Sequence, residues 1–419
     1  ANDLRYRDAK IDISDLTEIL EIDPVNRICI AESGVTFVDL VTATMQHGLL
    51  PIVVPELKTI TIGGAVAGCS IESMSYVHGG FHDTCIEYEV ITATGDVLTC
   101  RRDNEHALVF QMVHGTFGTL GIVARLTFKL VPAKPYVKLV YERYTTLADY
   151  QTAIRRHYEA RDIDFMDGII HSPTLYVLSA GTFVDRAPYT NRYDWVKVYY
   201  VSTRERAEDY LTTEQYVFRY DRGVTNVRPK SLVARILFGK AMASSQWLRI
   251  GQKLHWALPS KRPTVTLDVF VPFSKVPAFL EWYEREFNFY PLWCVPYRRV
   301  HDYEWLDSDY WKRIDDDLFL DLAIYGMKQP RNKSGERRTR SSAEGDAKII
   351  DKNVHRMIEE KLRELGGIKT LIAHNYYPEH EFWSIWSKPN YDAVKAITDP
   401  KNLFRDLYTK TCKAIMGLV

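Results

Sequence analysis

In the first third of the chain, some apolar residues recur at the spacing of a helix and others at the spacing of a strand. Residues 36–45 carry apolar side chains at helical spacing and have Thr36 in the position of an N-cap, so they predict a helix. Apolar runs and strict alternation predict strands at residues 27–31, 87–93 and 122–130. Short strands mixed with helices indicate an α+β domain in which a sheet lies over helices.

The remainder of the chain predicts a second set of elements. Helices are expected over residues 149–161, 277–287 and 351–365. Strands are expected before and between these helices, at residues 136–144, 165–170, 174–178, 264–271, 292–297 and 319–325. This order indicates an antiparallel sheet with helices on one face, so the fold class expected for the whole chain is α+β.

The composition limits the size, charge and compartment of the protein. At 419 residues the chain is longer than one core usually fills, so two domains are expected. The 54 Lys and Arg residues balance the 54 Asp and Glu residues, which argues against a nucleic-acid partner bound through a large positive charge. The six cysteines form no C-x-x-C pair, which argues against a zinc site and favours a reducing compartment.

The chain shows neither a spanning segment nor a signal peptide. No apolar run reaches the roughly 20 residues that cross a bilayer, and the first residues lack the pattern of a leader. The expected location is therefore cytoplasmic, with peripheral contact to a membrane as the alternative.

A basic segment interrupts the neutral balance of the chain. Residues 222–267 contain nine Lys or Arg residues and no Asp or Glu, with Trp and Leu between the cations. This mixture is typical of a segment that lies in a membrane interface. A basic helix packed on its own domain, or the mouth of an apolar substrate tunnel, would have the same composition. The polar stretch 329–348 is expected to be a mobile loop.

Three glycines, Gly63, Gly64 and Gly68, stand close together with small residues between them. A backbone without Cβ atoms can approach a planar or phosphorylated ligand closely, and free N–H groups in such a turn can hold a pyrophosphate. A tight turn packed under a helix would use the same glycines. The spacing matches neither the nicotinamide G-x-G-x-x-G pattern nor the P-loop.

The segment around these glycines resembles the flavin-binding domain of the vanillyl-alcohol-oxidase (PCMH-type) superfamily. Residues 11–23, 47–57 and 118–123 resemble further parts of that domain. Together with Ile71-Glu72-Ser73 and Phe382-Trp383, these segments are closest to the Δ24-sterol reductase branch of the superfamily.

The resemblance also implies how the chain is organised. Residues 1–135 would form the PCMH-type FAD-binding domain, residues 136–395 the substrate or cap domain, and residues 396–419 a segment that returns to the FAD domain. Family members carry a further small subdomain, with another phosphate-binding loop, ahead of the position of Ile11. The first subdomain is therefore expected to be absent here, which bears on the flavin content of the protein.

The resemblance implies a non-covalent FAD, because the usual attachment histidine belongs to that first subdomain and neither His78 nor His114 matches it. The glycines would approach the cofactor with their backbone, and the serines would bind its phosphate or ring oxygens. The predicted cofactor-binding residues are Pro55, Glu56, Thr61, Ile62, Gly63, Gly64, Gly68, Ser70, Glu72, Ser73, Gly121, Ile122 and Val123. No metal is expected.

Catalytic residues are expected on the second domain, where it faces the flavin ring. A cation after residues 292–297 would stabilise reduced flavin or orient a nicotinamide phosphate, and a Tyr or His would donate the proton when a double bond is reduced. Surface ion pairs and a packed aromatic corner are the structural alternatives for the same residues. The predicted catalytic residues are Tyr325, Arg298, His301, His374, Asn375 and Tyr376.

The resulting hypothesis is an FAD-dependent oxidoreductase that reduces a C=C double bond of a lipid, either sterol-like or fatty-acyl. NADPH or NADH would be the electron donor, and a hydrophobic small molecule the partner. Two alternatives stay open: oxidation of an alcohol or lipid carbon, and a flavin-free protein that binds lipid or membrane. No H-E-x-x-H or G-x-S-x-G motif supports a metalloprotease or an α/β-hydrolase.

Overall fold

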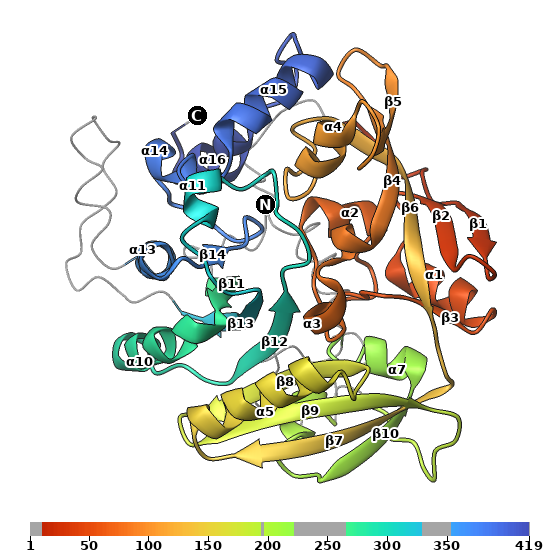
Figure 1. Cartoon of the computed structure of the whole chain (residues 1–419), viewed down its shortest axis with the longest axis vertical. Coiled ribbons are helices and arrows are strands. Elements are labelled where there is room, and N and C mark those ends of the chain that lie inside the picture. Colours follow the sequence, from red (N-terminus) through yellow and green to blue (C-terminus); the bar gives the residue numbers. More distant parts are fainter. Residues whose placement is uncertain (1–10, 194–196, 222–264, 329–352, 419) are drawn as a thin grey trace, which may run out of the picture.

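Two β-sheets, each with its own helices, organise the molecule (Figure 1). The computed structural model describes residues 11–193, 197–221, 265–328 and 353–418. Every strand pair in both sheets is antiparallel. The α+β fold class expected from the sequence is confirmed.

The first sheet has six strands in the order β1-β2-β6-β4-β5, with β3 also paired to β6. Its strands are β1 (Ile19–Asp23), β2 (Ile28–Glu32), β3 (Leu49–Pro51), β4 (Cys85–Ile91), β5 (Val97–Arg101) and β6 (Ile122–Pro132). Its helices are α1 (Phe37–Met45), α2 (Ile62–Ala67), α3 (Ser75–His78) and α4 (Ala107–Met112).

Helix α1 shows how the sequence pattern produces local structure. The backbone N–H of Asp39 donates to Thr36 Oγ1 at 3.4 Å, which confirms the predicted N-cap. Phe37, Leu40 and Val41 recur on one side of the helix and are fully buried. The strands predicted at 27–31, 87–93 and 122–130 are likewise confirmed as β2, β4 and β6, with small shifts at their ends.

The second sheet has eight strands in the order β10-β7-β9-β8-β12-β13-β11-β14. They are β7 (Tyr136–Tyr144), β8 (Phe165–Ser172), β9 (Leu175–Val184), β10 (Glu208–Thr212), β11 (Val265–Pro272), β12 (Leu292–Arg298), β13 (Leu318–Met327) and β14 (Ile368–Lys369). The predicted hairpin is confirmed, because β8 pairs with β9 directly.

Three helices cover the outer face of the second sheet: α5 (Leu147–Ala160), α10 (Val276–Glu286) and α13 (Val354–Leu365). The side chains beneath them are apolar and buried, among them Leu178, Leu320 and Leu322. Helices on one face of an antiparallel sheet were expected from the sequence, and this arrangement is confirmed.

The inner face of the second sheet lies against the first domain. Trp293, Tyr297 and Phe319 belong to the same buried cluster as Leu40 and Phe81 of the first domain. The backbone N–H of Met166, in β8, donates to the Ser73 carbonyl at 2.8 Å. The two sheets therefore share one core along their junction. Figure 1 shows α3 of the first domain beside β12 of the second sheet.

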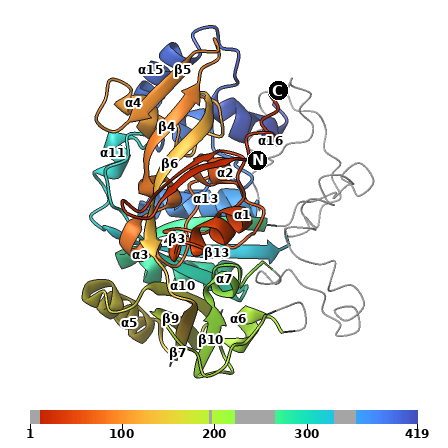
Figure 2. The same cartoon turned by 90° about the vertical axis from the view of Figure 1, so that its right-hand side faces the viewer.

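The last part of the chain contains α14 (Glu379–Phe382), α15 (Lys388–Thr398) and α16 (Ala414–Met416). It lies beside α4 and the end of β5 in both views (Figure 2). The Ala93 N–H donates to the Thr398 carbonyl at 2.8 Å, and Lys395 Nζ donates to the Thr119 carbonyl at 2.8 Å. Further short helices among the described residues are α6 (Tyr199–Ser202), α7 (Thr213–Val217) and α11 (Ser308–Trp311).

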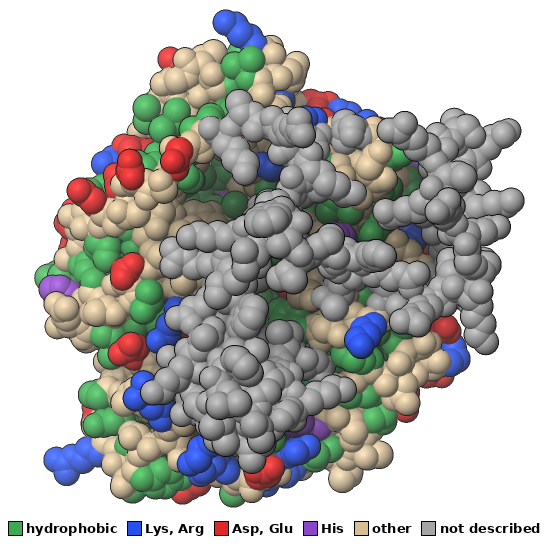
Figure 3. Space-filling view, turned by 180° about the vertical axis from the view of Figure 1, so that it is seen from behind, with side chains coloured by type: hydrophobic (Ala, Val, Ile, Leu, Met, Phe, Trp, Pro, Cys, Tyr) green, Lys and Arg blue, Asp and Glu red, His purple; other side chains and the backbone are tan. Residues whose placement is uncertain are grey.

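Two features predicted from the sequence lie outside the described residues. These are the basic segment 222–267, apart from its last three residues at the start of β11, and the loop 329–348. Within the described ranges, no helix combines the length and apolar character of a membrane span. On the coloured surface of Figure 3, basic and acidic side chains are interspersed, in line with a formal net charge of zero.

Candidate active site

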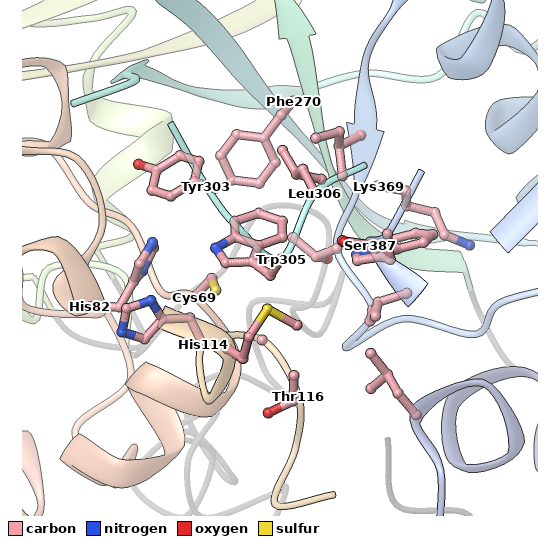
Figure 4. Close-up of a pocket in the computed structure, with 18 of the residues that line it drawn as sticks. Cys69, His82, His114, Thr116, Phe270, Tyr303, Trp305, Leu306, Lys369 and Ser387 are labelled. Carbon is pink, nitrogen blue, oxygen red and sulfur yellow. The ribbon is translucent and has the colours of Figure 1, made fainter. Parts of the chain in front are cut away.

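An aromatic cavity lies where the first domain, the second sheet and the C-terminal segment meet. The space between its walls is about 880 Å³, a volume that includes the solvent at its open mouth. Figure 4 shows Cys69, His82 and His114 on one side of it, Lys369 and Ser387 on the other, and Trp305 between them. The cavity is thus built from segments far apart in the sequence.

The cavity walls are mainly flat aromatic rings. Tyr303 stacks on Trp305 with ring centroids 5.1 Å apart, and Trp311 stacks on Phe319 at 6.2 Å. Lys369 is the single Lys or Arg in the described lining, which contains no Asp or Glu. Its ammonium group is already paired with Glu359. The described walls therefore favour an uncharged, flat or apolar ligand.

One end of the cavity is polar. Asp83 Oδ2 accepts hydrogen bonds from Tyr303 Oη at 2.9 Å and from the Gly80 N–H at 2.8 Å. The hydroxyls of Tyr297 and Tyr303 also contact each other. Because Asp83 belongs to the first domain and the tyrosines to the second, this cluster ties the two domains together at the cavity.

Two histidines stand beside this cluster, His82 and His114, with ring centroids 4.9 Å apart. Tyr88 Oη lies 3.0 Å from His114 Nε2. Burial lowers the pKa of His82 and lowers that of His114 further, because the charged imidazolium would lose its hydration. Both rings are therefore neutral at pH 7.

A group of carboxylic acids lies next to the cavity on the inner face of the second sheet. Phe270, which lines the cavity, pairs with Asp321 across the sheet. Asp268 lies two residues before Phe270 in β11 and therefore on the same face of the sheet. Tyr325 Oη donates to Asp268 Oδ1 at 2.6 Å. Glu56 of the first domain is close enough for its charge to raise the pKa of Asp321.

Burial favours the protonated form of these acids, because it raises their pKa values above those of exposed carboxyl groups. It raises the pKa of Glu56 to about 8 and that of Asp268 to about 6, and it raises the pKa of Asp321 well above its ordinary value. Neighbouring carboxylates add to the shift of Glu56 and Asp321 because like charges repel. Strongly shifted acids beside a ligand cavity are candidates for proton transfer.

A second buried ionic group joins the two domains beside the sheet. Arg219 contacts Glu72 at 2.9 Å and Asp167 at 3.2 Å, and all three side chains are almost completely buried. Tyr220 Oη and Trp293 Nε1 also donate to Asp167, at 2.8 and 3.1 Å. This group holds the loop that contains Glu72 against the second sheet.

At two of the three glycines of the predicted loop, the close backbone contacts are made to the protein itself. A Cβ on Gly63 would lie 2.6 Å from the Ser33 Cβ, and the Gly63 N–H donates to the Ser33 carbonyl. The Gly64 N–H donates to Thr61 Oγ1, the N-cap of α2. Gly68 lines the cavity.

The other predicted cofactor-binding residues have varied surroundings. Pro55 is buried beside Glu56, and Ile62 begins α2 in the core. The Ser70 carbonyl accepts from the Phe81 N–H, and Ser73 Oγ accepts from Tyr216 Oη at 3.0 Å. Gly121 has a φ of 136° and packs on β4, ahead of Ile122 and Val123 in β6. Their contact with a cofactor stays a prediction.

None of the six predicted catalytic residues is in the described cavity lining. Tyr325 belongs to the carboxylic-acid group, and His301 lies near Asp83 and His82. Arg298 ends β12. His374 stacks on His355, while the Tyr376 N–H donates to Glu359 at 3.0 Å.

Asn375 has a structural environment. Its amide nitrogen donates to the carbonyls of Leu371, Ala373 and Thr411, so it fastens the C-terminal segment to the turn after β14. The predicted catalytic set is thus spread over several clusters rather than gathered at one point.

Sequence reasoning missed the residues that form the polar end of the cavity: His82, Asp83, Tyr297 and Tyr303. Alternation along residues 292–298 contained a usable signal, because Tyr297 shares the inner face with Trp293 while Arg298 does not. No local sequence pattern distinguishes His82 and Asp83 from the residues of an ordinary turn. They stand out only in the tertiary structure, where both contact Tyr303.

The lining residues fit a flavin ring. Its flat system matches the stacked aromatic walls, and the neutral imidazoles match its uncharged polar edge. The turn at residues 115–118 adds left-handed residues, Gly115, Phe117 and Gly118, of the kind that form anion-binding backbone turns.

Comparison with known proteins also indicates a flavin-binding protein. The family described as FAD binding domain matches residues 2–101. Human Δ24-sterol reductase is 25% identical over 422 residues, which cover 95% of this chain and 77% of the relative. The pea (Pisum sativum) Δ24-sterol reductase is 28% identical over 330 residues, 70% of this chain and 57% of the relative.

A shorter match reaches cytokinin dehydrogenase 7 of rice (Oryza sativa subsp. japonica). It is 32% identical over 134 residues, which cover 31% of this chain and 25% of the relative. The chain is therefore an FAD-dependent oxidoreductase that is similar to members of the PCMH-type, vanillyl-alcohol-oxidase superfamily. The Δ24-sterol reductases are the relatives to which it is similar over most of its length.

Proposed function

We propose that this protein reduces a C=C double bond of a hydrophobic, sterol-like lipid, with NADPH or NADH as the electron donor. The observation that carries the proposal is the aromatic cavity, which lies between the FAD-binding domain and the second sheet. Its walls suit a large apolar ligand, and the relatives that span most of the chain are named Δ24-sterol reductases.

Bound FAD would supply the hydride for one carbon of the double bond. We assign its contacts to the cavity segments of the first domain, namely the backbone around Gly68 and Cys69 and the turn at residues 115–118. The aromatic walls exclude water from the site. The remaining cofactor contacts predicted from the sequence, such as Ser70 and Ser73, belong to the same proposal.

The other carbon of the double bond needs a proton. We assign the delivery of this proton to Glu56, Asp268 and Tyr325. Asp268 lies two residues from the cavity residue Phe270 on the same face of β11, and Tyr325 donates a hydrogen bond to it. Burial raises the pKa of Glu56 to about 8, so its carboxyl group holds a proton at neutral pH. A general acid of this kind contributes roughly 10²–10⁴-fold to the rate.

Anaerobic stopped-flow spectroscopy of the FAD-loaded protein tests the proposal. We expect NADPH or NADH to bleach the flavin absorbance, and an unsaturated sterol to restore it faster than air does. Tyr325→Phe should slow the sterol-dependent step at least tenfold. Tyr189→Phe, at a tyrosine that is 42% exposed, is the matched control and should not change the rate.

A dehydrogenase that oxidises its substrate is the second candidate, favoured by the match to a cytokinin dehydrogenase. In that case neither nicotinamide would bleach the flavin, whereas an alcohol or a saturated lipid would. Such a result would reverse the proposed direction of electron transfer. If FAD addition left the protein without flavin absorbance, both candidates would fail in favour of a lipid-binding protein without flavin.

A further inference from the structure

Basic side chains gather where the first domain joins the second sheet, outside the aromatic cavity. They are His78 at the end of α3, Arg161 at the end of α5 and Arg298 at the end of β12, and together they form the basic seam. In the part of the chain that the structure describes, none of them lines the cavity. Helix α3 lies beside β12 in Figure 1, which brings the seam residues of the two domains together.

The two arginines of the basic seam are held differently. Arg161 Nη1 donates to the Tyr76 carbonyl at 2.8 Å, and its guanidinium carbon lies 4.4 Å from the centre of the Tyr158 ring. Arg161 has a φ of 53°, a conformation that glycine adopts more easily at a helix end, so the arginine is kept there at a cost. Arg298 Nε is buried and has no hydrogen-bond partner among the described residues. A buried donor without a partner is destabilising, which indicates that a ligand completes it.

The charges at the basic seam have the same sign. Burial lowers the pKa of His78, and the positive charges of Arg161, Arg298 and Lys129 lower it further. These groups come from separate strands and helices, so the fold itself brings them together. Like charges that are held close to one another are unfavourable unless an anion offsets them.

The acids nearest in sequence to the basic seam have partners elsewhere. Asp162, which follows Arg161, pairs with His157 Nδ1 at 2.7 Å. Asp317 precedes the strand partner of Arg298, and its Oδ2 accepts a hydrogen bond from Tyr158 Oη at 2.5 Å. The described acids therefore leave the positive charge of the seam available to an anionic ligand.

The basic seam also borders the polar end of the cavity. Gly79 follows His78 and has a φ of 77°. A Cβ at Gly79 would collide with Asp83 Oδ2 and would lie 2.9 Å from Val300 Cγ2, so glycine alone fits between the seam and the cavity. An anionic group bound at the seam would thus keep the rest of its molecule close to the candidate active site.

We propose that His78, Arg161 and Arg298 bind a phosphate group at the basic seam. A guanidinium group presents several N–H donors in a fork that matches the oxygens of a phosphate, and a neutral imidazole adds one further donor. The bound phosphate would contact both domains, because α3 belongs to the first and the arginines to the second. This inference goes beyond the proposed reaction, since it concerns binding at a separate site.

Two pairs of probes on the FAD-loaded protein test the site and identify the molecule that carries the phosphate. The first pair is NADP⁺ and NAD⁺, which differ by one phosphate group, and calorimetry measures their binding. The second pair is phosphatidylcholine vesicles with and without phosphatidic acid, and flotation measures their binding. In one of the pairs, we expect the probe with the additional phosphate to bind about tenfold more tightly. Absence of such a preference in both pairs would overturn the inference.

Substitution of the arginines tests whether the preference arises at the basic seam. Arg298→Gln and Arg161→Gln should each bring the ratio between the two affinities close to one. Arg186→Gln, at an exposed arginine, is the matched control and should keep the ratio. A preference retained in both seam variants would overturn the assignment. If Arg298→Gln fails to fold, Arg161→Gln still decides, because Arg161 is exposed.

The binding assays separate this inference from the proposed function, because they need no turnover. A protein that reduces a double bond but shows no preference for the additional phosphate would contradict only the phosphate site. A protein that shows the preference but reduces no double bond would contradict only the proposed reaction.

Discussion

The eight-stranded sheet buries both of its faces, but the two faces are built from different side chains. In β13, Leu320, Leu322 and Ile324 point toward the helices and are fully buried in an apolar cluster. Phe319, Asp321 and Tyr325 alternate with them and point toward the FAD-binding domain. The same strand thus supplies a structural core on one side and part of the candidate site on the other.

The comparison shows that burial alone does not identify the role of a residue. Asp321 and Leu322 are neighbours that are both almost completely inaccessible to solvent. Burying an acid is costly, whereas burying a leucine is favourable. Acids retained on the inner face, including Asp167 and Asp268, therefore indicate a requirement other than stability.

The largest expected effect comes from the ionic group on the inner face. Arg219→Met leaves the buried carboxylates of Glu72 and Asp167 without their guanidinium partner, which should lower the free energy of unfolding by about 3–5 kcal/mol. Denaturant unfolding measures this change. Arg186→Met, at an exposed arginine, should stay within about 0.5 kcal/mol. A loss below about 1 kcal/mol at Arg219 would mean that this group does not join the domains as described.

On the outer face we expect a loss of stability without a change in function. Leu322→Ala creates a cavity under the helices and should lower the free energy of unfolding by about 2–5 kcal/mol. The FAD affinity of the folded protein, measured by flavin fluorescence, should be unchanged. Leu403→Ala, at a leucine that is 64% exposed, serves as the control. An altered FAD affinity in Leu322→Ala would show that the two faces are not independent.

Glu56, the acid of the first domain that lies near the acids of the inner face, should make stability depend on pH. Between the ordinary pKa of 4.5 and about 8, the folded protein holds a proton on Glu56 that the unfolded chain has released. The free energy of unfolding should therefore decrease as the pH rises through this window. Glu56→Gln should flatten the decrease, whereas Glu105→Gln, at an exposed glutamate, should leave it as it is. Equal slopes in all three proteins would contradict the shifted pKa.

The smallest expected change in stability comes from Asp321→Asn. Burial raises the pKa of Asp321 well above its ordinary value, and an amide has nearly the shape of the protonated acid. We expect the free energy of unfolding at pH 7 to change by less than about 1 kcal/mol, compared with the exposed control Asp315→Asn. A much larger loss would mean that Asp321 is charged and paired in the folded protein.

Much of the fold could be predicted because its signals are local. Helix α1, strand β7 and the β8–β9 hairpin follow from capping, alternation and turn residues within a few positions of each other. The glycine loop was found in the same way, through its spacing and its resemblance to flavin-binding domains. The candidate site was predicted less well. The sequence singled out Tyr325 as catalytic and Glu56 as cofactor-binding, but it did not single out Asp83, His82 or Tyr303.

The sequence by itself determined the secondary structure, the α+β class and the flavin-binding domain, because each depends on residues that are close along the chain. Only the tertiary structure decided which side chains meet. Trp293 and its acceptor Asp167 are 126 positions apart, and Tyr303 and Asp83 are 220 apart. No periodic pattern links residues over such separations. Their contacts arise when the two sheets pack face to face, which also forms the aromatic cavity and shifts the pKa values of the acids beside it.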